Sequence, residues 1–303
     1  MTDMTDFQSK ISLSLPNIKL LFHESMSAHT SFRIGGSVAV MAFPKSAEEL
    51  SEILKVSALL DIKPAILGAG TNVLAPDGGI DGLVICLKDS LNDIEIIDDT
   101  HIRVSAGVSM TRAAVFAANH GLSGLEFAHG IPGSVGGGVY MNAGAYGGEI
   151  KDVCVSVNVM TMDGVLHTYS AKEMDFSYRH SRLEDAGGIV VSAVFALSSK
   201  PMEDIKSYMQ ELAAKRKASQ PLDKPSAGSA FKRPVGGYAA ALIDEAGLKG
   251  FRVGDAAVSE KHAGFVVNLG NATAEDVKSL LQQVSDKVFA QTGIRLEPEV
   301  RIW

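Results

Sequence analysis

A nineteen-residue stretch in the middle of the chain, GIPGSVGGGVYMNAGAYGG at positions 130–148, contains eight of the chain's 30 glycines and no charged residue. Glycine loses more conformational freedom on folding than any other residue, so a concentration of glycines in an ordered segment needs a reason. Flexible linkers are typically rich in serine and other polar residues, whereas this stretch carries Ile131, Val135 and Met141. We therefore favour an ordered loop whose bare backbone a large ligand approaches closely, with a flexible linker as the alternative.

The composition argues against several classes of protein. At 303 residues the chain exceeds the usual size of one compact core, which predicts two or three domains. Its 28 basic and 35 acidic residues give a net charge of -7, so no global field attracts nucleic acid or an anionic membrane. The acidic N-terminus lacks the features of a signal peptide, and the longest apolar run, residues 188–197, is about half the length of a membrane-spanning helix. We expect a cytoplasmic protein that binds no nucleic acid and inserts no segment into a membrane.

The chain has only two cysteines, Cys86 and Cys154, and each lies in an apolar, strand-like run. A disulfide between them is possible, but two buried and reduced thiols of a cytosolic protein are the favoured interpretation. The sequence has no Cys-x-x-Cys, His-x-x-x-His or clustered carboxylate pattern. We therefore predict no metal site.

Up to about residue 200, predicted helices and strands are mixed without the strict alternation of a doubly wound sheet. Residues 46–61 form a predicted helix because Ser46 and Glu49 have capping-box spacing. A second predicted helix, residues 109–121, ends at Gly121. The predicted strands are residues 64–67, 82–87, 93–97, 101–107 and 189–197, together with a hairpin at 154–170 that turns at Asp163 and Gly164. This pattern predicts the α+β class.

A second unit begins near Pro201, where a long amphipathic helix is predicted. The predicted elements of this unit are helices at 201–218, 236–247 and 273–292, a loop at 219–229, and strands at 263–270 and 295–303. Residues 1–20 carry no motif, so their structure is left unassigned.

A second glycine turn, LGAGTNVL at residues 67–74, follows a predicted strand. A dinucleotide-binding fingerprint would need a third glycine at position 73, where this chain has Val73, and neither glycine stretch contains the Gly-Lys-Ser/Thr ending of a P-loop. An ordinary turn therefore remains an alternative. Backbone N–H groups in tight turns can nevertheless hold a phosphate without a helix. Two such loops in one domain suggest two sides of a single phosphate-bearing ligand.

Seven motifs occur in a characteristic order along the chain: TSFRIGG, GAGTN, GLEFAHGIPGSVGGGVYMNAGAYGGE, SYRHSR, PSAGSAFKRP, SEKHAGFVVN and LEPEVRIW. In this order the sequence resembles the UDP-N-acetylenolpyruvoylglucosamine reductases, the MurB family of flavoenzymes, from about Thr30 to the C-terminus. The resemblance is to the shorter subtype, which lacks a substrate-covering insertion. It implies a two-part FAD-binding domain of the vanillyl-alcohol-oxidase (PCMH) type and a C-terminal α+β substrate-binding domain. The implied boundaries are residues 21–200 for the first, with subdomains of about 21–90 and 91–200, and residues 201–303 for the second.

The resemblance also implies a reaction of peptidoglycan precursor synthesis. NADPH would reduce non-covalently bound FAD and leave, after which UDP-N-acetylglucosamine enolpyruvate would enter. A hydride from flavin N5 would pass to the enolpyruvyl methylene carbon and a proton to the neighbouring carbon, giving UDP-N-acetylmuramate. NADPH and the enolpyruvyl nucleotide sugar are thus the expected small-molecule ligands.

Three residues match the family's catalytic motif positions. Arg179 would pair with the substrate carboxylate through its planar fork of donors. Ser229 would give the proton, which a weakly acidic hydroxyl can do only to a strongly basic, enolate-like carbon. Glu299 would help polarise the carboxylate, a role suited to a protonated carboxyl group, and Glu297 is its rival two residues earlier.

The resemblance assigns further residues to cofactor and substrate. The expected cofactor-binding residues are Arg33, Gly35, Leu67, Gly68, Ala69, Gly70, Thr71, Asn72, Val73, Leu74, Gly130, Ile131, Pro132, Gly133, Ser134, Gly136, Gly137, Asn142, Ala143 and Gly144. The expected substrate-binding residues are Tyr178, Lys232 and Arg233, the last two as candidates for the pyrophosphate. For His129 and His262 we predict packing within loops and no covalent bond to the flavin.

Three other functions compete with this interpretation. A flavin oxidase of the same fold would share the N-terminal two thirds but not PSAGSAFKRP and LEPEVRIW. A catalytically inactive nucleotide-sugar sensor would be favoured by loss of Arg179, Ser229 or Glu299, and all three are present. A dehydrogenase that uses a nicotinamide cofactor without flavin would give a colourless protein.

Overall fold

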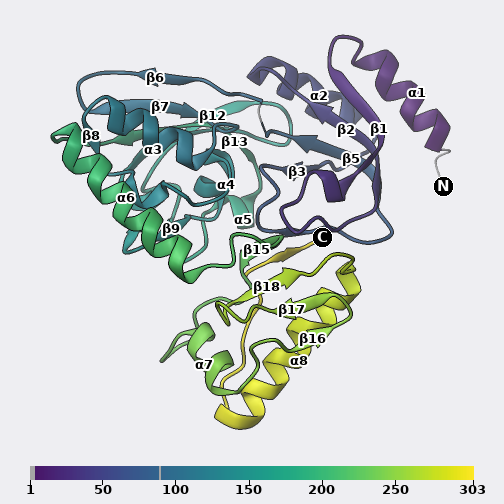
Figure 1. Ribbon diagram of the computed structural model, residues 1–303. Helices are drawn as coiled ribbons and strands as arrows, with labels where there is room; N and C mark the ends of the chain where they lie inside the picture. Colours follow the sequence, from purple (N-terminus) through teal and green to yellow (C-terminus); the bar gives the residue numbers. More distant parts are fainter. Residues whose placement is uncertain (1–3, 89) are drawn as a thin grey trace. The chain divides into compact units, whose positions relative to one another are not determined.

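The computed structural model describes residues 4–88 and 90–303, and it divides into two compact units (Figure 1). The first unit comprises Ala39–Ala69, Asp81–Lys215 and the described part of Met1–His23; the second comprises Glu24–Val38, Gly70–Ile80 and Arg216–Trp303. The later unit therefore begins after Lys215, inside the long helix predicted to start near Pro201, and it incorporates two early segments. Local sequence patterns could not reveal this, because the two segments join the second unit through long-range contacts. The domain boundaries given above stay a prediction.

The first unit contains a four-stranded sheet in the order β1-β2-β5-β3, in which β3 runs parallel to β5. Its elements are α1 (Met4–Ser14), β1 (Lys19–Ser25), β2 (Ser37–Phe43), α2 (Ala47–Leu59), β3 (Ala65–Leu67) and β5 (Ile80–Cys86). The α2 helix begins as predicted, since Ser46 Oγ accepts a hydrogen bond from the backbone N–H of Glu49 at 3.3 Å. The unassigned N-terminal segment forms α1, whose helical spacing places Phe7 and Ile11 in the same buried core, with Leu15 just after the helix.

A five-stranded antiparallel sheet in the order β12-β11-β13-β7-β6 forms the second half of this unit. Its strands are β6 (Ile94–Ile96), β7 (His101–Ser105), β11 (Cys154–Met160), β12 (Leu166–Ser170) and β13 (Ile189–Ala196). The helix α4 (Val135–Tyr140) packs on β7 and β13, and α3 (Met110–Asn119) packs on α4. Apolar residues of these elements make one continuous core.

Short elements complete the first unit. They are β8 (Leu122–Ser123), η2 (Glu126–Ala128), β9 (Gly144–Ala145), β10 (Gly148–Glu149), η3 (Ile150–Asp152), α5 (Leu183–Ala186), β14 (Ser198–Ser199) and most of α6 (Met202–Ser219). Both cysteines are buried thiols that do not form a disulfide with each other, as predicted, and burial raises the pKa of the Cys154 thiol to about 12.

The second unit is built on a four-stranded antiparallel sheet in the order β15-β18-β17-β16. Its elements are η1 (Met26–Ala28), β4 (Val73–Leu74), β15 (Ser226–Ser229), α7 (Ala239–Glu245), β16 (Arg252–Val253), β17 (Ala256–Val258), β18 (Phe265–Asn268), α8 (Ala274–Thr292) and β19 (Arg301–Ile302). The α8 helix lies against β16 and β17 and also contacts α7 (Figure 1). Phe32, Ile34 and Leu74, from the two early segments, are buried in the same core as these elements.

Several elements differ from the sequence predictions. The glycine-rich stretch contains the helix α4, although glycine disfavours helices. Ser226–Ser229 lies in the predicted loop 219–229 but pairs with β18 as a strand. The predicted last strand 295–303 is reduced to Arg301–Ile302, because Pro298 has no N–H with which to continue a ladder.

Candidate active site

The two glycine turns that the sequence assigns to one ligand are neighbours within the first unit. Gly68 follows β3, and Ser134 is the N-cap of α4. A Cβ atom on Gly68 would lie 2.7 Å from Ser134 Oγ and 4.0 Å from the backbone nitrogen of Gly137. A side chain at position 68 would displace Ser134 Oγ, so glycine lets the two turns lie side by side with little between their backbones.

The glycines at the start of α4 have different surroundings. A Cβ atom on Gly136 would lie 2.9 Å from Ala106 Cβ, and the Gly136 N–H donates to the Ala106 carbonyl at 2.8 Å. Gly137 is exposed, and its Cβ atom would meet only Ser134 Oγ, at 3.6 Å. Gly136 is therefore required by packing inside the protein, whereas Gly137 keeps open a surface that a cofactor could approach.

The loop before α4 is held from within the unit. Thr111 Oγ1 accepts from the Gly130 N–H at 3.1 Å, and the Gly133 carbonyl accepts from the Met110 N–H at 3.0 Å. The predicted cofactor residues Ile131 and Pro132 lie between these two bonds. These bonds give the loop one fixed shape.

The other glycine turn continues into the second unit, which contains the predicted residues Gly70, Thr71, Asn72, Val73 and Leu74. Gly70 has φ +65°, and a Cβ atom there would lie 2.0 Å from the His29 carbonyl oxygen, so no other residue fits. Val73 and Leu74 form β4, which pairs in parallel with β19. The turn is thus tied to the last strand of the chain.

Arg33 and Gly35 lie in the early segment of the second unit. Arg33 is exposed with φ +57°, between the buried side chains of Phe32 and Ile34. A Cβ atom on Gly35, whose φ is +127°, would lie 2.6 Å from Ala75 Cβ. The buried side chains of Phe32 and Ile34 on either side of Arg33 thus leave the Arg33 side chain directed outward.

Some predicted cofactor residues can offer only their backbone. Leu67, Leu74 and Ala143 have buried side chains that belong to the apolar core, and Ala69 lies in the turn between Gly68 and Gly70. If these residues contact the cofactor, they must do so mainly through main-chain atoms, because their side chains are buried or small.

Arg179 lies at the tip of a tight turn in the first unit. The N–H of Ser177 donates to the carbonyl of His180 at 3.1 Å, and that of His180 donates back to Ser177 at 3.2 Å. Arg179 has φ +56°, a left-handed conformation that an arginine adopts only at a cost. Its guanidinium group donates to the Gly144 carbonyl at 3.3 Å and lies 5.0 Å from the ring of Tyr178, which is 44% exposed. Strain of this kind clusters at functional sites.

The glycine-rich stretch itself fixes this turn, through two residues that follow α4. Asn142 is fully buried; its amide nitrogen donates to the Ser177 carbonyl at 2.9 Å and to Glu149 Oε2 at 2.7 Å, and its amide oxygen accepts from the Lys151 N–H at 3.0 Å. The hydroxyl group of buried Ser181 donates to the Tyr140 carbonyl at 2.6 Å. Sequence reasoning assigned Asn142 to the cofactor and missed Ser181. These contacts use the Asn142 side chain to hold the Arg179 turn, and its cofactor contact stays a prediction.

Ser229 is positioned by an irregular strand in the second unit. Ser226 pairs with Val267, and Ser229 pairs with Phe265, so β15 has one residue more than β18 between these pairs. Gly228 has φ +76°, which marks the bulge. Its neighbour Ser229 is partly exposed, whereas Ala227 and Ala230 on either side are buried.

The chain around Glu299 lies against the strand of Ser229. The Glu299 N–H donates to the Ala230 carbonyl at 2.9 Å, and the Glu299 carbonyl accepts from Asn72 Nδ2 at 3.2 Å. Its rival Glu297 is 75% exposed and forms a 3.6 Å ion pair with Lys232. The structure thus brings Glu299 and Ser229 onto adjacent segments of the second unit, while Arg179 belongs to the first unit.

The remaining predicted residues lie in loops. Arg233 is exposed and stacks over the ring of Tyr238 at 4.5 Å. His262 packs edge-on against Phe265, accepts a hydrogen bond from the Gly264 N–H, and has its pKa lowered by burial. His129 Nδ1 is buried without a hydrogen-bond partner among the described residues.

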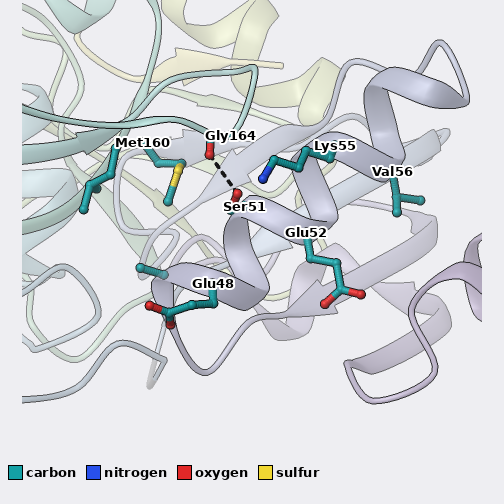
Figure 2. A pocket seen from close by; sticks show the side chains of 9 residues that line it. Glu48, Ser51, Glu52, Lys55, Val56, Met160 and Gly164 are labelled. Atoms are coloured by element: carbon teal, nitrogen blue, oxygen red, sulfur yellow. Dashed lines mark hydrogen bonds between the residues drawn. The ribbon is translucent and has the colours of Figure 1, made fainter.

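A cavity of about 450 Å³ lies elsewhere in the first unit, between α2 and the β11–β12 hairpin. Figure 2 shows Glu48, Ser51, Glu52 and Lys55 along α2, with Met160 and Gly164 opposite them. Ser51 Oγ donates to the Gly164 carbonyl at 2.7 Å, which holds the hairpin turn against the helix. The lining contains none of the predicted site residues.

Comparisons with known proteins decide between the competing interpretations. Residues 38–170 match the model of an FAD binding domain, and residues 220–303 match that of the UDP-N-acetylenolpyruvoylglucosamine reductase C-terminal domain. The chain is 49% identical to the UDP-N-acetylenolpyruvoylglucosamine reductase of Agathobacter rectalis over 98% of both chains. It is 45% identical to that of Streptococcus pneumoniae strain 70585 over 95% of both chains. The chain belongs to the UDP-N-acetylenolpyruvoylglucosamine reductase family.

The crystal structure of the MurB protein from Thermus caldophilus superposes with a TM-score of 0.80 at 36% identity, covering 95% of this chain and 99% of the other. The predicted family, the fold class and FAD as cofactor are therefore confirmed, and the chain is a flavin-dependent oxidoreductase of the MurB kind. No helix within residues 4–88 and 90–303 is long and apolar enough to cross a membrane. The individual site residues and the cytoplasmic location stay predictions.

Proposed function

We propose that this MurB enzyme reduces UDP-N-acetylglucosamine enolpyruvate to UDP-N-acetylmuramate with electrons from NADPH. The observation that carries this proposal is that the MurB-type C-terminal domain is present together with the FAD-binding domain and with Arg179, Ser229 and Glu299. An oxidase of the same fold would not need the C-terminal motifs. The bound FAD would accept a hydride from NADPH and deliver it to the methylene carbon of the enolpyruvyl group.

The surfaces that would receive FAD are the adjoining turns at Gly68 and Ser134–Gly137. They fit the group in one respect: Gly137 is exposed, and its missing side chain leaves the surface open. Backbone N–H groups of such turns suit phosphate oxygens. Arg33, exposed in the second unit, would add a positive charge for the same cofactor.

Arg179 would bind the substrate carboxylate and stabilise the charge that builds on it. As hydride adds to the methylene carbon, the electrons of the carbon–carbon double bond move towards the neighbouring carbon and its carboxylate, giving an enolate-like species. A planar guanidinium group can hold both carboxylate oxygens through parallel hydrogen bonds. Because the Arg179 turn is already fixed by Asn142 and Ser181, this stabilisation needs little reorganisation when charge develops.

Ser229 would complete the reaction by giving its hydroxyl proton to the enolate-like carbon. The new C–H bond takes the electron pair of the enolate, and the serine alkoxide then regains a proton from solvent. Glu299, whose backbone bonds to the residue after Ser229, would help polarise the carboxylate together with Arg179. Lys232, Arg233 and Tyr178 would contribute to binding the nucleotide part of the substrate.

Two half-reactions, followed by flavin colour, test this proposal. We expect the purified protein to be yellow, to bleach anaerobically with NADPH, and to regain colour when the enolpyruvyl substrate is added. The Ser229→Ala variant should bleach at a nearly normal rate but recolour about 10²–10⁴-fold more slowly, the usual range for loss of a general acid. Equal losses in both steps would remove Ser229 as the proton donor, and bleaching without recolouring in the unmodified protein would refute the assigned substrate.

A further inference from the structure

Ser31 links the second glycine turn to the strand that carries Ser229, all within the second unit. The Ser31 N–H donates to the Gly70 carbonyl at 3.0 Å. Its hydroxyl group lies 2.6 Å from the Ser226 carbonyl oxygen and 3.4 Å from the Gly70 carbonyl oxygen. A serine hydroxyl has one proton, and the shorter distance assigns it to Ser226.

The Ser226 carbonyl lies at the start of the bulge in β15. From Ser226 to Ser229 the strand takes one residue more than its partner β18, and Gly228 accommodates this with a positive φ. Bulges redirect the side chains that follow them. Beyond the bulge, the Ala230 N–H donates to the Gly264 carbonyl at 2.8 Å, so the irregular segment is held at both ends.

The glycine turn at Gly70, which Ser31 also contacts, is equally constrained. Gly70 leaves no room for a side chain against the His29 carbonyl, and two residues later Asn72 bonds to the backbone of Glu299. Ser31 therefore connects a turn predicted to hold the cofactor with the strand predicted to hold the proton donor. Its partly buried hydroxyl contacts both through main-chain atoms.

We propose that Ser31 is a positioning residue that fixes the Ser229 hydroxyl for proton delivery, an inference that rests on the proposed role of Ser229. Removing the Ser31 hydroxyl would delete its short bond to the Ser226 carbonyl and its longer contact with the Gly70 carbonyl, but the Ser31 N–H would still donate to Gly70. The glycine turn would keep its shape while the bulge gained freedom. Proton delivery would then suffer, because small displacements of a reacting group cost rate steeply.

The test compares the two half-reactions in Ser31→Ala, with Ser27→Ala as the matched control. Ser27 lies in the same early segment, and its hydroxyl group forms a hydrogen bond with that of exposed Ser25 at 2.8 Å. In Ser31→Ala, flavin reduction by NADPH should stay within about twofold, and recolouring by saturating substrate should slow about tenfold, the size of one lost hydrogen bond. The solvent deuterium isotope effect on recolouring should rise, since proton transfer becomes more limiting. Ser27→Ala should change none of these.

A second pair of variants keeps the test valid if Ser31→Ala does not fold. The Ser31→Thr variant keeps the hydroxyl group. The Ser31→Val variant has a side chain of nearly the same shape as threonine but without the hydroxyl group. We expect normal recolouring in the threonine variant and the tenfold loss in the valine variant. Equal recolouring rates in this pair would overturn the proposal.

Combination with Ser229→Ala separates positioning from a general structural effect. If Ser31 acts through Ser229, then Ser31→Ala should cause no further slowing in the Ser229→Ala background. The same tenfold slowing in both backgrounds would overturn the inference while leaving the role of Ser229 intact. Normal recolouring in Ser229→Ala alone would instead refute the proposed proton donor itself.

Discussion

Arg179 and Ser229 both lie at irregular points of the backbone, but the two regions place the unusual dihedral angle on different residues. In the first unit Arg179 itself adopts φ +56°, and a buried amide from Asn142 holds its turn. In the second unit Gly228 adopts φ +76°, so Ser229 beside it carries no strain. A glycine takes this conformation at no steric cost, whereas an arginine must be held in it by its surroundings. The first region should therefore depend more strongly on its supporting contacts.

Asn142→Ala tests this dependence and should have the largest effect. It removes three hydrogen bonds from a fully buried position, so we expect the free energy of unfolding to fall by about 2–3 kcal/mol. Recolouring of the reduced flavin by substrate should also slow, because the Arg179 turn loses its anchor at Ser177. Denaturant unfolding and stopped-flow absorbance measure the two effects.

Asn158→Ala is the control for this variant. Asn158 also bonds through both amide atoms, but to Ser192 and Thr168 on the neighbouring strands β13 and β12. It should lose stability without a selective effect on recolouring. If both variants slow recolouring alike, Asn142 has no special relation to Arg179.

The glycines of α4 should respond in opposite directions to alanine. Gly136→Ala forces a methyl group against Ala106 and should cost about 1–2 kcal/mol of unfolding free energy. Gly137→Ala adds a methyl group to an exposed helical position and should gain about 0.5–1 kcal/mol. Gly137→Leu should keep the fold but lower the affinity for FAD, measured by flavin release on dilution. Normal FAD affinity in Gly137→Leu would place the cofactor elsewhere.

Gly228→Ala probes the bulge at a smaller cost. Within residues 4–88 and 90–303, and apart from its two chain neighbours, no heavy atom lies within 4 Å of the place a Gly228 side chain would take, so the cost is conformational, about 1 kcal/mol. Gly236 has φ +84° and equally open space, which makes Gly236→Ala a matched control in the same unit. Both variants should unfold at similarly lowered denaturant concentrations, but only Gly228→Ala should slow recolouring of the reduced flavin, the step in which Ser229 is the proposed proton donor. A selective loss in Gly236→Ala instead would mean that the bulge does not position Ser229.

The sequence predicted elements whose signals are local. The N-cap residues are Ser46 for α2 and Thr273 for α8, and each side chain accepts a hydrogen bond from a backbone N–H only three residues later. The helix α4 was missed because its glycines disfavour a helix. The close contacts of Gly136 with Ala106 and of Gly138 with Met110 join residues that are distant in sequence. Propensity could not predict a helix whose reason is packing.

In the candidate site, too, local motifs could be recognised from the sequence, whereas the long-range contacts that hold the residues could not. Motif resemblance named Arg179, Ser229 and Glu299, but no pattern indicated what holds them. Asn142 reaches Ser177 across 35 residues, and Ser31 reaches Ser226 across 195. The resemblance predicts Asn142 as a cofactor residue, but it does not indicate that its side chain holds the Arg179 turn. Its positive φ and its three internal bonds become visible only in the folded chain.

Two variants of Arg179 can separate the strain of its backbone from the charge of its side chain. The expected difference in stability between them is the smallest effect. Arg179→Ala and Arg179→Gly both remove the guanidinium group, so both should abolish normal recolouring of the flavin by substrate. They differ in backbone freedom: alanine keeps the cost of φ +56°, whereas glycine avoids it. The glycine variant should therefore be more stable than the alanine variant by about 0.5–1 kcal/mol, which paired denaturant unfolding curves can resolve. An alanine variant as stable as the glycine variant would mean that the turn relaxes when the arginine is removed, so that Arg179 imposes the conformation instead of being held in it.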